Sequence, residues 1–84
     1  MYYATWCGHS RNFLPVWNSV KNTIKNDSAL NTICLDYDCD INRNLCVGVR
    51  GYPHVEFIKN DGTKIDYNGQ RSVQSIIDFI NKNK

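Results

Sequence analysis

Helical and strand patterns alternate along this chain, and that alternation most narrows the folds open to it. Apolar residues recur at helical spacing over residues 7–25 and again after Ser72, which is a plausible helix N-cap. A shorter helical pattern covers 42–49. Strand patterns cover 1–4, 32–38, 55–59 and 64–67, the last two separated by the turn sequence Asn60-Asp61-Gly62-Thr63. The order β-α-β-α-β-β-α predicts an α/β fold: a four-stranded mixed sheet flanked by three principal helices.

The length and net charge of the chain limit the kinds of function that it can have. Eighty-four residues predict a single domain over 1–84, too small for a large cofactor cleft. No apolar run reaches the roughly 20 residues of a membrane span, so we expect no membrane partner. A formal charge of +2 is too weak to indicate nucleic acid. We expect a monomer without a bound cofactor.

The cysteines are the residues most able to carry chemistry. Cys7, Cys34, Cys39 and Cys46 have no Cys-x2-Cys spacing, so we expect no metal site. The chain has neither a secretory signal nor an endoplasmic-reticulum retrieval signal, which predicts an intracellular, cytoplasmic location with reduced thiols. Cys34 is expected in the core. For Cys39 and Cys46 we favour burial as small apolar groups, with a disulfide between them as the alternative.

Cys7 lies where a strand pattern ends and a helical pattern begins. Helix N-termini present free amide donors and a positive dipole end, which favour thiolate over thiol. Ser10 is placed to donate a hydrogen bond to the sulfur, His9 and Arg11 add positive charge nearby, and Trp6 offers an apolar shelf. This setting predicts a nucleophilic cysteine; the alternative is a small hydrophobe at a helix cap.

The run Tyr2-Tyr3-Ala4-Thr5-Trp6-Cys7-Gly8-His9-Ser10-Arg11 resembles the active site of the thioredoxin superfamily. It is most similar to the catalytic domains of protein disulfide isomerases, which read Phe-Tyr-Ala-Pro-Trp-Cys-Gly-His-Cys-Lys. Pro15 matches the kink proline of the family's active-site helix, and Asp38-Cys39 and Leu45-Cys46 match the Asp-Cys and Leu-Cys positions of the same branch. Two longer segments also match: Val49-Arg50-Gly51-Tyr52-Pro53 resembles the segment that ends in the family's cis-proline, and Tyr67-Asn68-Gly69-Gln70-Arg71 resembles its Tyr-x-Gly-x-Arg segment.

The resemblance implies a minimal thioredoxin/glutaredoxin-like fold with a cis-proline at Pro53 facing the active-site sulfur. Catalytic roles then fall to Cys7, Ser10 and His9, and substrate binding to Trp6, Gly8, Tyr52 and Pro53, with an ordinary trans-proline as the alternative for Pro53. His54 is either a residue of the substrate groove or an exposed strand residue.

Three departures from the family pattern matter. Ser10 replaces the resolving cysteine, Met1 stands where the family has a buried acid, and the family's first strand and helix have no counterpart. The last departure predicts that the strand over 32–38 is an uncovered edge.

These features predict a monothiol thiol–disulfide oxidoreductase or isomerase. Its substrates would be protein disulfides, protein thiols or glutathionylated cysteines, with glutathione as co-substrate. The alternative is a non-turnover binding module, which tethers client thiols through Cys7 or binds extended peptides at Pro53. The asparagine and lysine bias in so compact a chain is consistent with a viral or parasitic genome.

Overall fold

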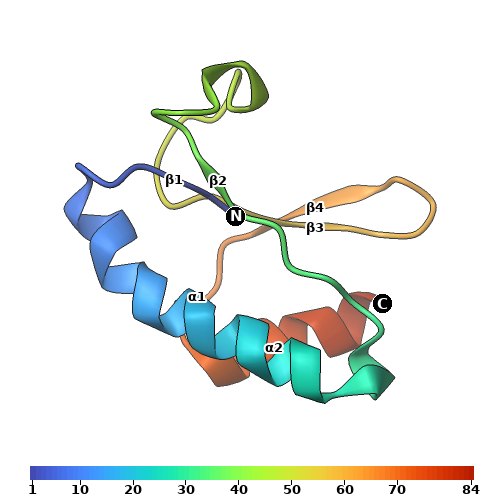
Figure 1. The fold of residues 1–84 in the computed structure, drawn as a ribbon. Coiled ribbons are helices and arrows are strands. Elements are labelled where there is room, and N and C mark those ends of the chain that lie inside the picture. The colour runs from blue at the N-terminus through green and yellow to red at the C-terminus, as the bar shows by residue number, and fades with distance from the viewer.

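A computed structural model describes residues 1–84. The elements, in chain order, are β1 (Tyr2–Tyr3), α1 (Gly8–Asn26), η1 (Ser28–Leu30), β2 (Tyr37–Asp38), η2 (Arg43–Leu45), β3 (Val55–Ile58), β4 (Lys64–Tyr67) and α2 (Val73–Asn83). The α/β class and the thioredoxin-like arrangement expected from the sequence are confirmed, with differences in the strands and helices described below (Figure 1).

The strands form two ladders joined by one bridge. β1 pairs in parallel with β2, and β3 pairs antiparallel with β4. Between them, the Tyr2 amide donates to the His54 carbonyl at 2.8 Å, and the His54 amide donates back to the Tyr2 carbonyl at 2.9 Å. The lateral order of the strands is therefore β2-β1-β3-β4. Parallel and antiparallel pairing are mixed, as predicted, but β1 and β3 are joined only by the Tyr2–His54 bridge.

Both α-helices lie on the same side of the strands (Figure 1). The helical stripe of α1 and the inner face of α2 form the core together with Met1 and Leu30; the helix residues are Phe13, Trp17, Val20, Ile24, Ile76 and Ile80. Tyr3, Val55 and Phe57 pack against this core from the strands. Strand side chains that alternate with these point to the other face, where no helix covers them.

The helix ends follow the sequence signals. Cys7 is the N-cap of α1, and Ser72 is the N-cap of α2, with its hydroxyl accepting the Ser75 amide at 3.3 Å. α1 continues through Pro15 without interruption; the kink expected there stays a prediction. The turn between β3 and β4 is confirmed, with Gly62 at φ 89°, a conformation that glycine adopts without strain. Neither helix is apolar enough over a sufficient length to cross a membrane.

Two expected elements are much shorter than predicted. The strand over 32–38 is reduced to Tyr37–Asp38, because β1 offers it only two residues to pair with. The prediction of a helix over 42–49 is wrong, because the structure has only a single 3-10 turn there, Arg43–Leu45. Gly48 at φ 90° and the closed ring described next prevent continued helical geometry there, so the chain has two α-helices rather than three.

Cys39 and Cys46 form a disulfide, with their Cα atoms 5.7 Å apart. The favoured interpretation of these residues as packed free thiols is therefore wrong, although both are buried. The sequence gives spacing but no geometry, and only geometry decides whether two thiols can bond. Cys34 is free, half-buried and packed against the core, as predicted.

Candidate active site

Cys7 occupies the junction between β1 and α1. Its backbone is extended, at φ −88° and ψ 123°, and its carbonyl accepts the Arg11 amide at 3.1 Å as the first bond of the helix. The Cys7 amide donates to the Ala4 carbonyl at 3.1 Å, which closes the turn after β1. The side chain is only partly exposed. The local sequence thus folds so that the sulfur lies beside the free amides of the first helical turn.

These neighbours lower the pKa of the Cys7 thiol. The largest cause is a hydrogen bond from the Ser10 amide, which outweighs the opposing effect of desolvation. The His9 amide, the Ser10 hydroxyl and the Arg11 charge lower the pKa further. Because the thiolate is the nucleophilic form of cysteine, a lowered pKa increases the reactive fraction near neutral pH.

Ser10 is the one buried polar residue, with 1% of its surface exposed. Its hydroxyl oxygen accepts the Ala4 amide at 3.3 Å. The hydroxyl proton remains available to the sulfur, consistent with the lowered pKa of Cys7. Ser10 therefore links the strand end to the nucleophile.

A loop distant in sequence forms the opposite side of the site. The Cys7 thiol donates to the Tyr52 carbonyl across 3.7 Å, and the Tyr52–Pro53 peptide bond is cis. Directly after Pro53, His54 makes the bridge to Tyr2 that joins the two ladders. The same backbone connection that completes the sheet therefore holds this loop against the sulfur.

Trp6 covers the outer side of the site. Its side chain is 66% exposed, its ring meets that of Tyr52 edge-on at 6.0 Å, and its indole N–H donates to Asp40 Oδ1 at 2.9 Å. Asp40 follows Cys39, so the disulfide-closed loop positions the acceptor for Trp6. Sequence reasoning missed Asp40; its place beside a matched Asp-Cys pair was the only available signal.

The sequence matches the thioredoxin family over residues 1–82. The chain belongs to the thioredoxin family. Among curated proteins, protein disulfide-isomerase erp38 of Neurospora crassa is 33% identical over 82 residues, which cover 94% of this chain and 22% of that protein. Protein disulfide-isomerase of Ricinus communis is 35% identical over 83 residues, covering 99% of this chain and 17% of that protein.

A third relative is thioredoxin domain-containing protein R362 of Acanthamoeba polyphaga mimivirus, 34% identical over 86 residues, with 96% of this chain and 25% of that protein covered. The chain thus spans a quarter or less of these three relatives. Among solved structures, the J-Trx1 fragment of ERdj5 has a TM-score of 0.83 at 25% identity, covering 96% of this chain and 39% of that one. The zinc-bound form of human ERp44 has a TM-score of 0.81 at 26% identity, covering 96% and 25%.

In this thioredoxin-family chain, Cys7, Ser10, Trp6, Tyr52 and Pro53 meet at one place, as the contacts above establish. Gly8 and His9 form the exposed start of α1. His9 contributes its amide to the thiol, while its imidazole makes no hydrogen bond or ion pair in the structure.

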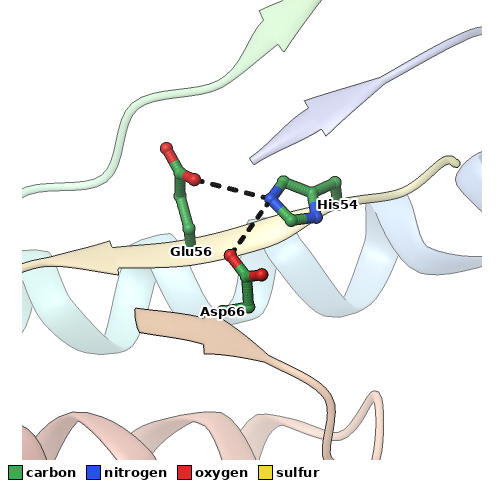
Figure 2. Close-up of side chains that lie close together, drawn as sticks. All are labelled: His54, Glu56 and Asp66. Carbon is green, nitrogen blue, oxygen red and sulfur yellow. Dashed lines mark ion pairs between the residues drawn. The ribbon is translucent and has the colours of Figure 1, made fainter. Parts of the chain in front are cut away.

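His54 belongs to a separate cluster on the face of the strands away from the helices (Figure 2). Its Nε2 lies 3.4 Å from Glu56 Oε2 and 3.5 Å from Asp66 Oδ1. Glu56 and Asp66 are direct cross-strand partners in β3 and β4, and the Tyr2 hydroxyl donates to Glu56 at 3.0 Å. These three residues are the group whose donor atoms, within 4.8 Å of one another, could hold a metal ion. Sequence reasoning missed it, because the register of β3 and β4 creates it.

Proposed function

We propose that this chain is a monothiol thiol–disulfide oxidoreductase or isomerase with Cys7 as its nucleophile. The observation that carries the proposal is a cysteine of lowered pKa at the N-cap of α1, facing the Tyr52 carbonyl, with a serine three residues later. Membership of the thioredoxin family and similarity to protein disulfide isomerases support thiol–disulfide chemistry in general. The monothiol mechanism is the specific part of the proposal.

The reaction begins with attack of the Cys7 thiolate on one sulfur of a substrate disulfide. A Cys7–substrate disulfide forms, the original S–S bond breaks, and the second substrate sulfur leaves as a thiolate. In isomerisation, another substrate thiolate then attacks the substrate sulfur bound to Cys7 and regenerates the Cys7 thiolate, with no net oxidation. In deglutathionylation, Cys7 takes glutathione from the substrate, and a second glutathione releases it as glutathione disulfide.

No thiol of this chain is placed to resolve the intermediate. The Ser10 hydroxyl cannot attack a disulfide as a thiolate does. Cys39 and Cys46 are bonded to each other. Cys34 is half-buried, and burial raises the pKa of its thiol. Release therefore depends on an external thiol, for which glutathione is the proposed co-substrate.

The substrate side of the site consists of the exposed Trp6 ring, the Tyr52 ring at right angles to it and the adjoining Pro53. We propose that these residues receive the chain around a protein disulfide or a glutathionylated cysteine. A cytoplasmic location, where glutathione is reduced and abundant, remains part of the proposal.

The test compares the native chain with Cys7→Ser, Ser10→Cys and Cys34→Ser in a glutathione-coupled assay on a glutathionylated peptide and on a scrambled disulfide protein. We expect turnover for the native chain and Cys34→Ser, and none for Cys7→Ser. Ser10→Cys should gain reduction of protein disulfides, because it restores an internal resolving thiol. Turnover retained by Cys7→Ser would overturn the proposal.

The absence of a resolving thiol also favours a second candidate, a binding module that holds client thiols through a lasting Cys7 mixed disulfide. Its signature in the same assay would be one equivalent of trapped substrate without multiple turnover at cellular glutathione concentrations. Peptide binding at the Pro53 loop that is unchanged in Cys7→Ser would indicate the non-covalent form of this module.

A further inference from the structure

The strands bring one imidazole and two carboxylates together on the face away from the helices. Alternate residues of a strand share a face, so His54, directly before β3, and Glu56 within it point the same way. Asp66 lies directly opposite Glu56 in β4 and shares that face. Figure 2 shows the three side chains converging, with the ring nitrogen Nε2 turned toward both carboxylates. Three potential ligand atoms therefore lie within 4.8 Å of one another.

The distances within this cluster indicate which kind of cation suits it. A protonated imidazole bound to a carboxylate makes a charge-assisted hydrogen bond of about 2.7–2.9 Å. Nε2 of His54 instead lies 3.4 Å from Glu56 Oε2 and 3.5 Å from Asp66 Oδ1, which is longer than such bonds. Metal–ligand bonds of about 2.1 Å at tetrahedral angles separate neighbouring ligand atoms by about 3.4 Å. Both separations from Nε2 therefore match the edges of a metal-centred tetrahedron.

Only His54 lies close enough to offset the negative charge of Glu56 and Asp66. Like charges at directly opposed positions of two strands destabilise the pair. Neither carboxylate forms an ion pair with a lysine or arginine. The Glu56 side chain is 14% exposed, against 62% for Asp66, so water screens the charge of Glu56 less. A divalent cation bound between the two carboxylates would neutralise both.

Two of the three side chains are already held in position. The Tyr2 hydroxyl donates to Glu56 Oε1 at 3.0 Å, whereas the other oxygen, Oε2, faces His54. A hydrogen bond of this kind, from a neighbouring residue to a ligating carboxylate, orients the ligand in known metal sites. The backbone of His54 is fixed by its two hydrogen bonds to Tyr2. The more exposed Asp66 side chain can adjust its position to a bound ion.

We propose that His54 Nε2, Glu56 Oε2 and Asp66 Oδ1 bind a Zn²⁺ ion. Imidazole nitrogen is a good ligand for Zn²⁺, whereas Mg²⁺ and Ca²⁺ prefer sets made of oxygen atoms alone. Three protein ligands fill three of the four positions around zinc and leave the fourth for water or an external ligand. The lack of Cys-x2-Cys spacing has no bearing on this set, because it contains no cysteine.

The proposed zinc site is separate from the thiol chemistry proposed for Cys7. None of its three ligands contacts the sulfur, which faces the Tyr52 carbonyl. The ion would connect β3 and β4 beside the Tyr2–His54 bridge, which is the one connection between the two ladders. A ligand that binds only the folded chain stabilises it, so zinc should raise the unfolding temperature. The site can therefore be tested without reference to activity.

The test titrates the isotope-labelled, tag-free chain with Zn²⁺ and follows the ring resonances of its two histidines by NMR. We expect saturable shifts of the His54 ring and a higher unfolding temperature. Because thiolates also bind zinc, the titration is repeated on Cys7→Ser, which should bind at His54 with the same affinity. Mg²⁺ at the same concentrations should leave the His54 ring unchanged.

Substitutions then identify the ligands. His54→Gln, Glu56→Gln and Asp66→Asn each remove one ligand with little change of shape and should weaken Zn²⁺ binding by more than about tenfold. Tyr2→Phe keeps all three ligands and removes the hydrogen bond that orients Glu56, so it should weaken binding by about tenfold. His9→Gln is the matched control, because it removes the other histidine, and it should bind zinc as the native chain does.

Three results would overturn the proposal. The first is absence of saturable shifts of the His54 ring, or their loss in Cys7→Ser, which would place the metal at the thiol. The second is native affinity in Asp66→Asn, which lies at an exposed position and so keeps the test decisive if a variant of His54 or Glu56 does not fold. The third is equal binding of Mg²⁺, which would indicate unspecific attraction of cations to the carboxylates.

Discussion

The two free cysteines, Cys7 and Cys34, lie in surroundings that shift the pKa of a thiol in opposite directions. Around Cys7, amides of the first turn of α1 and the Ser10 hydroxyl lower the pKa. Around Cys34, desolvation raises the pKa, although the Met1 amino group and Lys21 oppose it. Both side chains are partly buried. The pKa of a thiol in this chain thus depends on two separate factors: directed hydrogen-bond donors activate Cys7, and desolvation keeps Cys34 in its neutral form.

Removing each sulfur in turn tests the difference between the two thiols most directly. Cys7→Ser should abolish formation of mixed disulfides with a glutathionylated peptide, because no other thiol is activated. Cys34→Ser should leave it unchanged. Mass spectrometry of the trapped adducts measures both. An adduct on Cys34 in the Cys7→Ser chain would show that exposure alone suffices.

Alkylation rates measure the reactivity of the two thiols separately. At pH 7, Cys7 should react with iodoacetamide faster than Cys34, since the lowered pKa of Cys7 enlarges its thiolate fraction and the raised pKa of Cys34 reduces that of Cys34. The ratio should shrink as pH rises through the pKa of Cys34, where both thiols ionise. Peptide mapping over pH 5 to 10 supplies the two profiles, and parallel profiles would contradict the opposite pKa shifts.

Ser10→Ala tests the donors around Cys7. It keeps the Ser10 amide, the largest cause of the lowered pKa, and removes the hydroxyl. The alkylation profile of Cys7 should move to higher pH, with a loss of rate at pH 7 of less than about tenfold. Stability should fall by about 1–3 kcal/mol, because the Ala4 amide loses its acceptor in a buried position. An unchanged profile would assign the lowered pKa to the backbone amides and the Arg11 charge, without the hydroxyl.

Asp36→Ala tests the surroundings of Cys34. Despite desolvation, hydrogen bonds from Trp17 and Lys21 hold the pKa of Asp36 below its ordinary value. Its stabilising contribution is therefore present above the unfolded-state pKa of about 3.9 and is lost as pH falls through the lower folded-state pKa. Urea unfolding at pH 7 should show a loss of about 1–3 kcal/mol.

The matched control, Lys21→Ala, removes only a partly exposed ion pair and should cost about 0–1 kcal/mol. Asp36 also raises the pKa of Cys34, so Asp36→Ala should make Cys34 slightly more reactive. Equal losses of stability in the two variants would show that the ion pair, rather than the Trp17 indole bond, is what Asp36 contributes.

The sequence predicted the parts of this molecule that depend on local pattern. The stripe of α1, the Ser72 cap and the turn before β4 follow from spacing and residue type, and so does the N-cap position of Cys7. The truncation of the strand over 32–38 depends on how far its neighbour extends, and the Cys39–Cys46 bond depends on a Cα separation. The contact of Asp40 with Trp6 depends on loop placement, for which the position of Asp40 after the matched Asp38-Cys39 pair was the only signal. The cluster at His54 depends on strand register, for which sequence spacing carries no signal.

The two tryptophans, Trp6 and Trp17, lie in such different surroundings that their fluorescence can report on two separate events. Trp6 is largely solvent-exposed beside the nucleophile and bonded to Asp40, whereas Trp17 is 6% exposed in the core and bonded to Asp36. Blue-shifted emission from Trp17 therefore measures folding, while red-shifted emission from Trp6 responds to what is attached to Cys7. With each tryptophan replaced by phenylalanine in turn, the fluorescence of one variant follows capture of a substrate and that of the other follows integrity of the core.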